Sequence, residues 1–182
     1  DRVRLQQRAH RSVTLALYEM AKPTVAILPG PAAGAGLSLA LACDLRYAAD
    51  TAVLTTAFGK VALPGDFGGA WLLTQIVGTA KARELFYLSP RIDAAEALKL
   101  GLLTAIHPAA ELEKAAYAVA RDLAAGPGAA FGYMKDNFTR ATTHGLADYL
   151  DIEAIHQIRC RDSEDHREAA AAFVEKRLPR FR

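Results

Sequence analysis

A strand pattern, a glycine bend and an apolar helix pattern follow one another near the start of the chain, and this succession constrains the fold most. The run "TVAIL" (24–28) is rich in β-branched residues and lies between Pro23 and Pro29, so it predicts a buried strand. Residues 30–34 predict a bend, and the apolar run 35–43 is typical of a helix buried on every side. Such a succession requires strands and helices layered around one core.

The remaining patterns extend this α/β reading. Residues 3–20 predict an amphipathic helix, and residues 59–69, "GKVALPGDFGG", predict a second glycine- and proline-rich loop. Asp93 is placed to cap a helix at its N-terminus, with Glu96 as its capping partner, and Gly101 is placed to end that helix. Further strands are predicted at 45–49, 52–56 and 102–108, and further helices at 70–77, 79–88 and across 109–178 with breaks at 126–128 and near Gly145. We therefore expect an α/β core at 1–125 and a helical extension of the same domain at 126–182.

Composition excludes several classes of protein. A chain of 182 residues with 52% apolar content can bury one core, and its net charge of +2 argues against nucleic-acid binding or a membrane surface. No apolar run reaches the ~18 residues of a membrane helix. Cys43 and Cys160 lack a paired spacing, which argues against a disulfide framework or a zinc site and favours a reducing, cytoplasmic compartment. The histidines show no metal-ligand spacing, so we expect no metal and place them on the surface or at helix ends: His10, His107, His144, His156 and His166.

The glycine bend "GPAAGAG" (30–36) does not match the phosphate-binding motifs. It lacks the Lys-Ser/Thr ending of a P-loop, and no acidic residue follows at the distance that a dinucleotide fold needs. A turn into a helix still presents backbone N–H groups, which can stabilise a developing oxyanion. The small residues would equally suit a tight turn crossed by a neighbouring helix. Both interpretations stay open on spacing alone.

Three longer stretches resemble the enoyl-CoA hydratase/isomerase (crotonase) superfamily. They are "KPTVAILPGPAAGAGLSLALACDLRYAAD", "LPGDFGGAWLLTQIVGTAKARELFYLSPRIDAAEALKLGLLTAIHP" and "SEDHREAAAAFVEKRLPRF", which together run from about residue 20 to the end of the chain. The resemblance implies a crotonase-like core of short strands and helices, a ββα spiral, with an all-helical C-terminal extension. It also implies an acyl-CoA substrate, with coenzyme A as part of that substrate and no permanently bound cofactor.

The resemblance assigns the glycine bend a role in binding the thioester. In this family the central residue of the bend donates its backbone N–H to the thioester carbonyl, and that residue is Ala35 here, beside Gly34. Because the donor is a backbone amide, alanine can replace glycine where its φ and ψ are allowed. The family's other oxyanion donor belongs to an N-terminal portion that would precede Asp1, so we expect that portion of the fold to be missing from this chain.

Hydratases of this family use two glutamates, and this chain has neither. Their positions are occupied by Ser38 and Phe58, whereas Asp66 stands where several isomerases of the family carry an acid. A single carboxylate can take a proton from one carbon and return it to another, so the resemblance favours double-bond isomerisation over hydration. We expect apolar neighbours of Asp66 (Phe58, Leu63, Phe67 and Trp71) to raise its pKa. The residues expected to help bind the substrate are Gly34, Ser38, Phe58, Pro64 and Gly65. The alternative for Ser38 is a small hydroxyl bonded to a preceding carbonyl in a packed helix. The alternative for Asp66 is an exposed turn residue.

The C-terminal helices carry the remaining predictions. Phe173 and Lys176 match family positions near the coenzyme A adenine and 3′-phosphate. Residues 145–176 are predicted to form two helices, whose apolar residues imply a homotrimer or hexamer. Asp44 matches a family position that we interpret as structural. Two other functions stay open: another crotonase-type hydrolase or lyase, and a coenzyme A-binding paralogue without catalysis.

Overall fold

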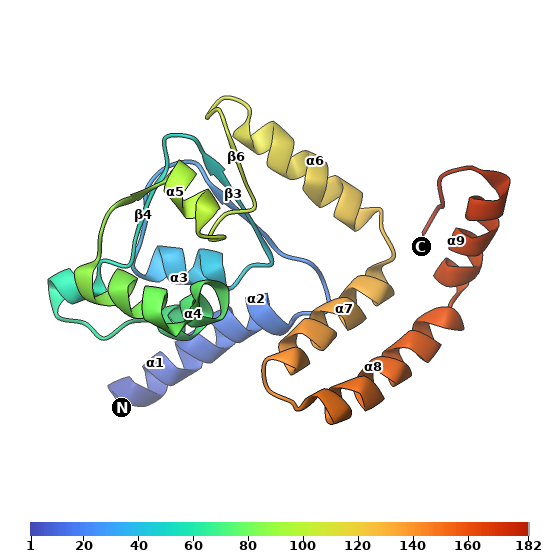
Figure 1. Ribbon diagram of the computed structural model, residues 1–182, viewed down its shortest axis with the longest axis horizontal. Coiled ribbons are helices and arrows are strands. Elements are labelled where there is room, and N and C mark those ends of the chain that lie inside the picture. The colour runs from blue at the N-terminus through green and yellow to red at the C-terminus, as the bar shows by residue number, and fades with distance from the viewer. Residues whose placement is uncertain (182) are drawn as a thin grey trace. The chain divides into compact units, whose positions relative to one another are not determined.

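The computed structural model describes residues 1–181, which divide into two compact units (Figure 1). The first unit comprises Asp1–Tyr18 and Thr24–Ala118, and the second comprises Glu19–Pro23 and the residues from Val119 onward. The boundary falls inside helix α6 (Leu112–Ala124). That both units form one domain stays a prediction.

Strands and helices alternate in the first unit, as the sequence patterns predicted. The four strands β1, β3, β4 and β6 lie within the four predicted runs, and Gly78 interrupts α4 with a non-helical φ of 74° where two helices were expected. The elements from residue 25 to residue 107 are β1 (Val25–Leu28), β2 (Ala32–Ala33), α3 (Ala35–Leu41), β3 (Leu45–Ala49), β4 (Val53–Thr55), η2 (Phe58–Val61), α4 (Gly69–Leu88), β5 (Ile92–Asp93), α5 (Ala94–Lys99) and β6 (Ala105–His107).

The strands form two small sheets. One has the order β1-β3-β6 with both pairs parallel, and its register sets Ile27 beside Tyr47 and Tyr47 beside Ala105. The other has the order β2-β4-β5, in which β2 and β4 are parallel while β4 and β5 are antiparallel. The two-residue strands β2 and β5 were not predicted, because two residues are too few to show a period. Parallel neighbours need helical crossovers, which accounts for α3 between β1 and β3.

Small and branched apolar side chains fill the core of the first unit. Ala48, Ala49, Leu73 and Leu102 are all fully buried. Alanine on β3 leaves room for close packing, because the strand is buried along its last three residues. Asp44 braces the start of β1, since its carboxylate accepts hydrogen bonds from the Thr24 amide at 2.6 Å and the Thr24 hydroxyl at 2.8 Å.

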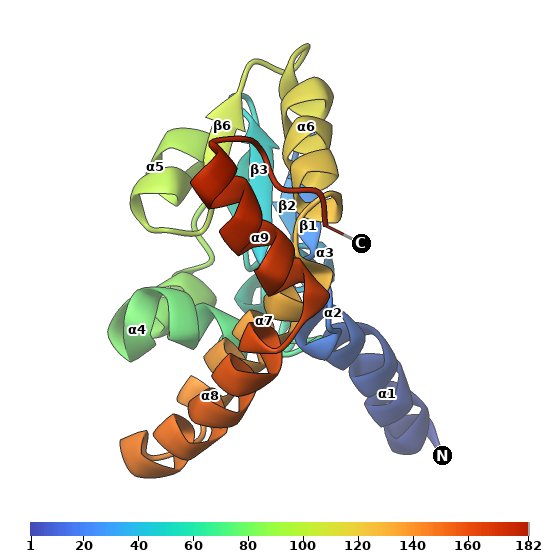
Figure 2. The ribbon, with the colours of Figure 1, turned by 90° about the vertical axis from the view of Figure 1, so that its right-hand side faces the viewer.

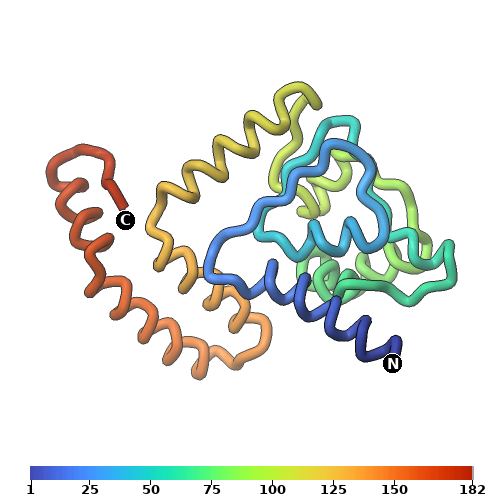
Figure 3. Tube along the Cα trace, turned by 180° about the vertical axis from the view of Figure 1, so that it is seen from behind, coloured from blue at the N-terminus to red at the C-terminus, as the bar shows by residue number. Residues whose placement is uncertain are grey.

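The predicted N-terminal helix forms with a π-helical segment in its middle. It comprises α1 (Arg2–His10), η1 (Arg11–Leu15) and α2 (Ala16–Glu19), which follow one another as one rod in Figure 3. Asp1 caps the first turn, where its side chain accepts a hydrogen bond from the Val3 amide. A π-helical turn shifts the residues that follow it around the helix axis, so the pattern of this helix could not give its facing residues.

Helices make up the second unit. After the end of α6 come α7 (Gly128–Ala141), α8 (Leu146–Arg161) and α9 (Glu164–Glu175), with α7 against α8 and α8 against α9 (Figure 2). The breaks at 126–128 and near Gly145 are confirmed. The two helices predicted within 145–176 are confirmed as α8 and α9, and the boundary lies where Ser163 caps α9 by accepting a hydrogen bond from the His166 amide at 3.1 Å.

Candidate functional site

The glycine bend leads into α3, and the first amides of that helix have no hydrogen-bond partner within the helix. Gly34 adopts φ 52° and ψ −123°, which only glycine adopts readily, and its amide donates to the Thr55 carbonyl at 3.2 Å. Gly34 caps α3 without a side chain, so no capping side chain accepts a hydrogen bond from the first turn. Ala35 is the first helical residue, where an amide has no partner within its own helix. The bend therefore presents the Ala35 backbone amide as a donor, with a glycine at the preceding position of positive φ.

An apolar groove borders the same bend. Its volume is about 630 Å³, and it runs past Ala33 and Gly36 along β1 and α3. Leu28, Leu39 and Cys43 also line it. Gly36 is exposed toward it, so α3 is not buried on every side as its composition had suggested.

Ser38 packs inside the unit. It is 2% exposed, and its hydroxyl donates to the Gly34 carbonyl one turn earlier at 3.2 Å. A Cβ added to Gly69 would lie only 2.2 Å from the Ser38 hydroxyl oxygen, so α3 and α4 meet at these two residues. This geometry fits the packing interpretation of Ser38, and its role in substrate binding stays a prediction.

Phe58 forms an apolar wall beside the bend. Its ring stacks on Phe86 with the ring centroids 5.8 Å apart, and it is 6% exposed. A Cβ on Gly34 would lie 3.8 Å from the Phe58 ring, which places the ring against the bend itself. A phenylalanine ring cannot act as an acid or a base, so this position contributes no proton transfer.

Residues 65–68 form a loop in which backbone strain is concentrated. Gly65, Phe67 and Gly68 have φ values of 130°, 47° and 75°, and a left-handed conformation is rare for a residue as bulky as Phe67. Such a conformation costs roughly 1–3 kcal/mol and persists only where the surroundings impose it. Here the Thr14 hydroxyl donates to the Phe67 carbonyl at 3.2 Å. Strained loops of this kind are concentrated at functional sites.

Asp66 lies at the centre of this loop and is held by polar groups. Its Oδ1 accepts hydrogen bonds from the Phe67 amide at 3.0 Å and from the Gln6 side chain at 3.0 Å. His10 Nε2 contacts the same oxygen, and the Asp66 and His10 side chains are 29% and 34% exposed. Asp66 is thus neither a fully exposed turn residue nor a carboxylate in a dry pocket.

The expected apolar surroundings of Asp66 are therefore wrong. Leu63 is 57% exposed, Trp71 is 45% exposed and packs its ring against Tyr18, and Phe58 packs on Phe86. The sequence placed these apolar residues near Asp66 along the chain, but the fold turns the carboxylate toward the polar stripe of the first helix. Pro64 is exposed, and Gly65 lies against the Phe86 ring.

Sequence reasoning missed the three side chains that contact this loop: Gln6, His10 and Thr14. They are spaced four residues apart in the predicted amphipathic helix, for whose polar residues no partner was predicted. A polar stripe at positions i, i+4 and i+8 was the available signal, but it does not identify what the stripe faces. His10 does lie at a helix end, as predicted, whereas His156 is buried at 8% exposure and bonded to Asn137 at 2.5 Å. The surface position predicted for His156 is wrong because its ring stacks on Tyr133.

The C-terminal candidates lie in the second unit. Phe173 is 85% exposed near the end of α9, and Lys176 is exposed at its C-cap with φ 54°. Neither position identifies a ligand, so their contact with coenzyme A stays a prediction.

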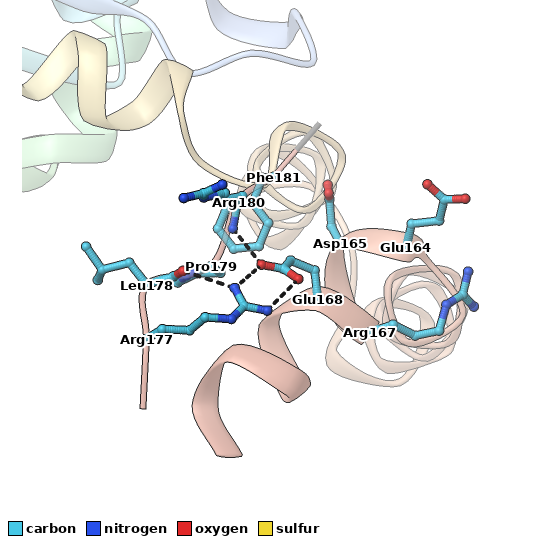
Figure 4. A pocket seen from close by; sticks show the side chains of 9 residues that line it. All are labelled: Glu164, Asp165, Arg167, Glu168, Arg177, Leu178, Pro179, Arg180 and Phe181. Carbon is cyan, nitrogen blue, oxygen red and sulfur yellow. Dashed lines mark hydrogen bonds and ion pairs between the residues drawn. The ribbon is translucent and has the colours of Figure 1, made fainter. Parts of the chain in front are cut away.

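A cavity of about 1130 Å³ lies beside α9, where the C-terminal segment folds back (Figure 4). Figure 4 shows Arg177 reaching Glu168 with both terminal nitrogens, at 2.5 and 3.0 Å, and the Arg180 amide donates to the same carboxylate at 2.9 Å. These donors lower the pKa of Glu168 to about 2, with the Arg177 side chain as the main cause. The Glu168 carboxylate beside this cavity is therefore already paired within the chain.

Between residues 1 and 181, no group of three or more His, Cys, Asp or Glu side chains is arranged to hold a metal ion. Within the same part of the chain, no helix has the length and apolarity to cross a membrane.

Comparison with known proteins gives one consistent result. The family model described as enoyl-CoA hydratase/isomerase matches residues 4–182. A probable enoyl-CoA hydratase of Rhodobacter capsulatus is 39% identical over 166 residues, which cover 91% of this chain and 65% of that protein. The 1,2-epoxyphenylacetyl-CoA isomerase of Escherichia coli is 35% identical over 175 residues, which cover 96% of this chain and 67% of that protein. The chain thus spans about two thirds of the length of these curated relatives.

Solved structures agree with the sequence matches. A putative enoyl-CoA hydratase from Streptomyces coelicolor superposes with a TM-score of 0.94 at 36% identity, covering 100% of this chain and 67% of that one. An enoyl-CoA hydratase from Polaromonas gives a TM-score of 0.92 at 33% identity, covering 96% of this chain and 68% of the other.

Proposed function

Because the chain belongs to the enoyl-CoA hydratase/isomerase family and has the crotonase-like α/β fold, we propose that it acts on an acyl-CoA thioester and moves a double bond. The thioester carbonyl accepts a hydrogen bond from the Ala35 amide, and Asp66 transfers a proton between two carbons of the acyl chain. Coenzyme A enters as part of the substrate, and the reaction needs no resident cofactor.

One observation supports isomerisation over hydration more than any other. The positions of the two hydratase glutamates hold Ser38, whose hydroxyl is bonded to the Gly34 carbonyl, and Phe58, whose ring is buried. Hydration needs groups that hold and activate water, whereas an allylic proton shift needs one carboxylate and a stabilised enolate. Asp66 supplies that carboxylate from a strained loop.

The reaction balances within the substrate. Asp66 takes a proton from a carbon that the thioester or a conjugated double bond acidifies, and the negative charge spreads to the thioester oxygen. The same proton returns from Asp66 to a different carbon of the extended enolate. No water is consumed, and the product has the mass of the substrate.

The names of the relatives support the family but not one reaction. The Escherichia coli relative is an isomerase, the Streptococcus mutans relative is a trans-2-decenoyl-[acyl-carrier-protein] isomerase, and the Rhodobacter capsulatus relative is a probable hydratase.

The test of the proposed reaction is incubation of the purified protein with 2-enoyl-, 3-enoyl- and dienoyl-CoA and mass detection of the products. Isomerised product of unchanged mass supports the proposal, whereas addition of water would indicate a hydratase. Coenzyme A binding in calorimetry without turnover would indicate a non-catalytic paralogue, and release of free coenzyme A would indicate a hydrolase.

Self-association as a trimer or hexamer is part of the proposal. Apolar side chains of α8 and α9 are at least half exposed, including Leu146, Ile155, Ile158, Phe173 and Val174. Light scattering at micromolar concentration tests this, with Ile155→Glu expected to shift the mass toward a monomer. Gln157→Glu adds a charge at a polar exposed position of the same helix and serves as the control. A monomeric mass for the parent protein would contradict the proposal. A cytoplasmic location stays a prediction.

A further inference from the structure

One stripe of the N-terminal helix contacts the loop that carries Asp66. The Gln6 side chain donates to Asp66 Oδ1, the His10 ring contacts the same oxygen, and the Thr14 hydroxyl donates to the Phe67 carbonyl. The His10 ring also lies against the Phe67 ring, with centroids 4.9 Å apart and planes inclined by 50°. The His10 ring is therefore held on two sides, by the Asp66 carboxylate and by the Phe67 ring.

The two oxygens of Asp66 differ in their surroundings. Oδ1 accepts hydrogen bonds from the Phe67 backbone amide and the Gln6 side-chain amide, and it contacts the His10 ring. Oδ2 has no hydrogen bond to any residue from 1 to 181. Donors gathered on one oxygen fix the plane of the carboxylate and leave the other oxygen available. A general base needs this arrangement, because its reactive oxygen must be aimed while remaining free of donors.

We propose that His10 is a positioning residue for Asp66, one that holds Oδ1 through its Nε2–H and so directs Oδ2 toward the substrate carbon. This inference rests on the proposed role of Asp66 in double-bond isomerisation. His10 keeps its proton throughout, while Oδ2 accepts a proton from one substrate carbon and returns it to another. The imidazole touches neither the substrate nor the reacting atoms.

Gln6 supports this arrangement but cannot replace His10. The Gln6 side-chain nitrogen lies 3.0 Å from Asp66 Oδ1 and 2.8 Å from His10 Nε2. With the proton on Nε2, both nitrogens are donors, so each directs its hydrogen at Oδ1 and neither bonds the other. A glutamine side chain is flexible, whereas the His10 ring is fixed by its contact with Phe67. Loss of the ring should let the carboxylate rotate, and a misplacement of about 1 Å can cost roughly 10²-fold in rate.

The test compares His10→Ala with His10→Gln. Alanine removes the donor, so we expect kcat to fall about 10- to 100-fold while KM changes less than about twofold. Glutamine places an amide nitrogen near the position of Nε2 and can donate but not titrate, so it should restore most of the lost kcat. Gln7→Ala, at the neighbouring exposed position of the same helix, is the matched control and should leave kcat unchanged. Circular dichroism and unfolding midpoints establish that each variant is folded.

Asp66→Asn separates this inference from the proposed function. If His10 acts through Asp66, His10→Ala should cause no further loss in the Asp66→Asn background. An equal loss in both backgrounds, an unchanged kcat in His10→Ala, or no rescue by glutamine would overturn the role of His10 alone. Full turnover by Asp66→Asn would overturn the proposed function and the role of His10 together.

A measurement on the resting protein gives a second readout. Nitrogen-15 NMR of the parent should show His10 with its proton on Nε2, and Asp66→Ala should abolish that tautomer preference. A proton on Nδ1 in the parent would contradict the proposed hydrogen bond, whatever the activity.

Discussion

A methyl group added at Gly69 tests the packing that brings the glycine bend and the Asp66 loop into one unit. The new Cβ would lie 2.2 Å from the Ser38 hydroxyl oxygen and 3.1 Å from the Ser38 Cβ, both shorter than side chains tolerate. Ser38 is 2% exposed, so it has little room to move away. Overpacking of this kind costs roughly 1–3 kcal/mol, against a gain of up to about 1 kcal/mol for alanine over glycine in a helix. We expect Gly69→Ala to be about 1–3 kcal/mol less stable than Gly36→Ala, which has the same helix gain without the close contact.

Urea unfolding followed by fluorescence measures this loss. Trp71, the only tryptophan of the chain, lies two residues after Gly69 in α4 and reports on the first unit. Gly36→Ala is the control, because a Cβ there meets nothing within 4 Å and the change should be neutral or slightly stabilising. Ser38→Ala removes the closest contact, so the double variant should recover part of the loss, with a coupling energy of about 1 kcal/mol. Gly69→Ala as stable as Gly36→Ala would refute the close approach of α3 and α4.

Three further predictions concern the oxyanion donor, the half-buried Arg46 and a C-terminal ion pair. Ala35→Pro removes the proposed donor at the first helical position, which tolerates proline, so turnover should fall about 10²–10³-fold in steady-state assays while Ala35→Gly stays near parent activity; a folded, fully active proline variant would make the bend purely structural. Arg46 donates to the Leu102 and Cys43 carbonyls at 2.7 and 2.5 Å, and burial lowers the pKa of its guanidinium. Arg46→Met should therefore cost about 1–3 kcal/mol in urea unfolding, and an unchanged midpoint would contradict this. The pKa of Glu168 is lowered to about 2, so its pairing with Arg177 stabilises the folded chain fully above pH 4.5, and this stabilisation is lost as the pH falls through about 2. In a carboxyl NMR titration, the pKa of Glu168 should move toward 4.5 in Arg177→Ala, and no movement would refute the pairing.

Local chemistry made much of the fold predictable. Asp93 accepts a hydrogen bond from the Glu96 amide at 2.8 Å, and Gly101 adopts φ 75° after the helix that it was expected to end. These features depend on neighbours within a few residues, which a single sequence displays. The β-branched run 24–28 likewise formed β1, but only its last residue, Leu28, is buried, so the prediction that the whole strand is buried is wrong.

The candidate site was predictable only in part, because its contacts join distant segments. Asp66 was identified from its family position, but its partners Gln6 and His10 are about sixty residues away and come from a helix that contains a π-helical segment. The amphipathic pattern predicted a helix with a polar face, but it could not predict that this face contacts the loop at 65–68. The boundary between the two helices predicted over 145–176 was not assigned to Ser163 for a related reason, because a serine cap inside a helical composition gives a weak signal.

Turnover by Asp66→Asn tests the central claim most directly. Asparagine keeps the size and shape of the side chain, so the variant should fold and bind coenzyme A thioesters as the parent does. Loss of a positioned acid–base group should lower kcat by about 10²–10⁴, and exchange of solvent deuterium into the acyl chain should fall with it. If Asp66→Asn isomerises and exchanges at the parent rate, Asp66 is not the proton-transfer group and the proposed mechanism is wrong.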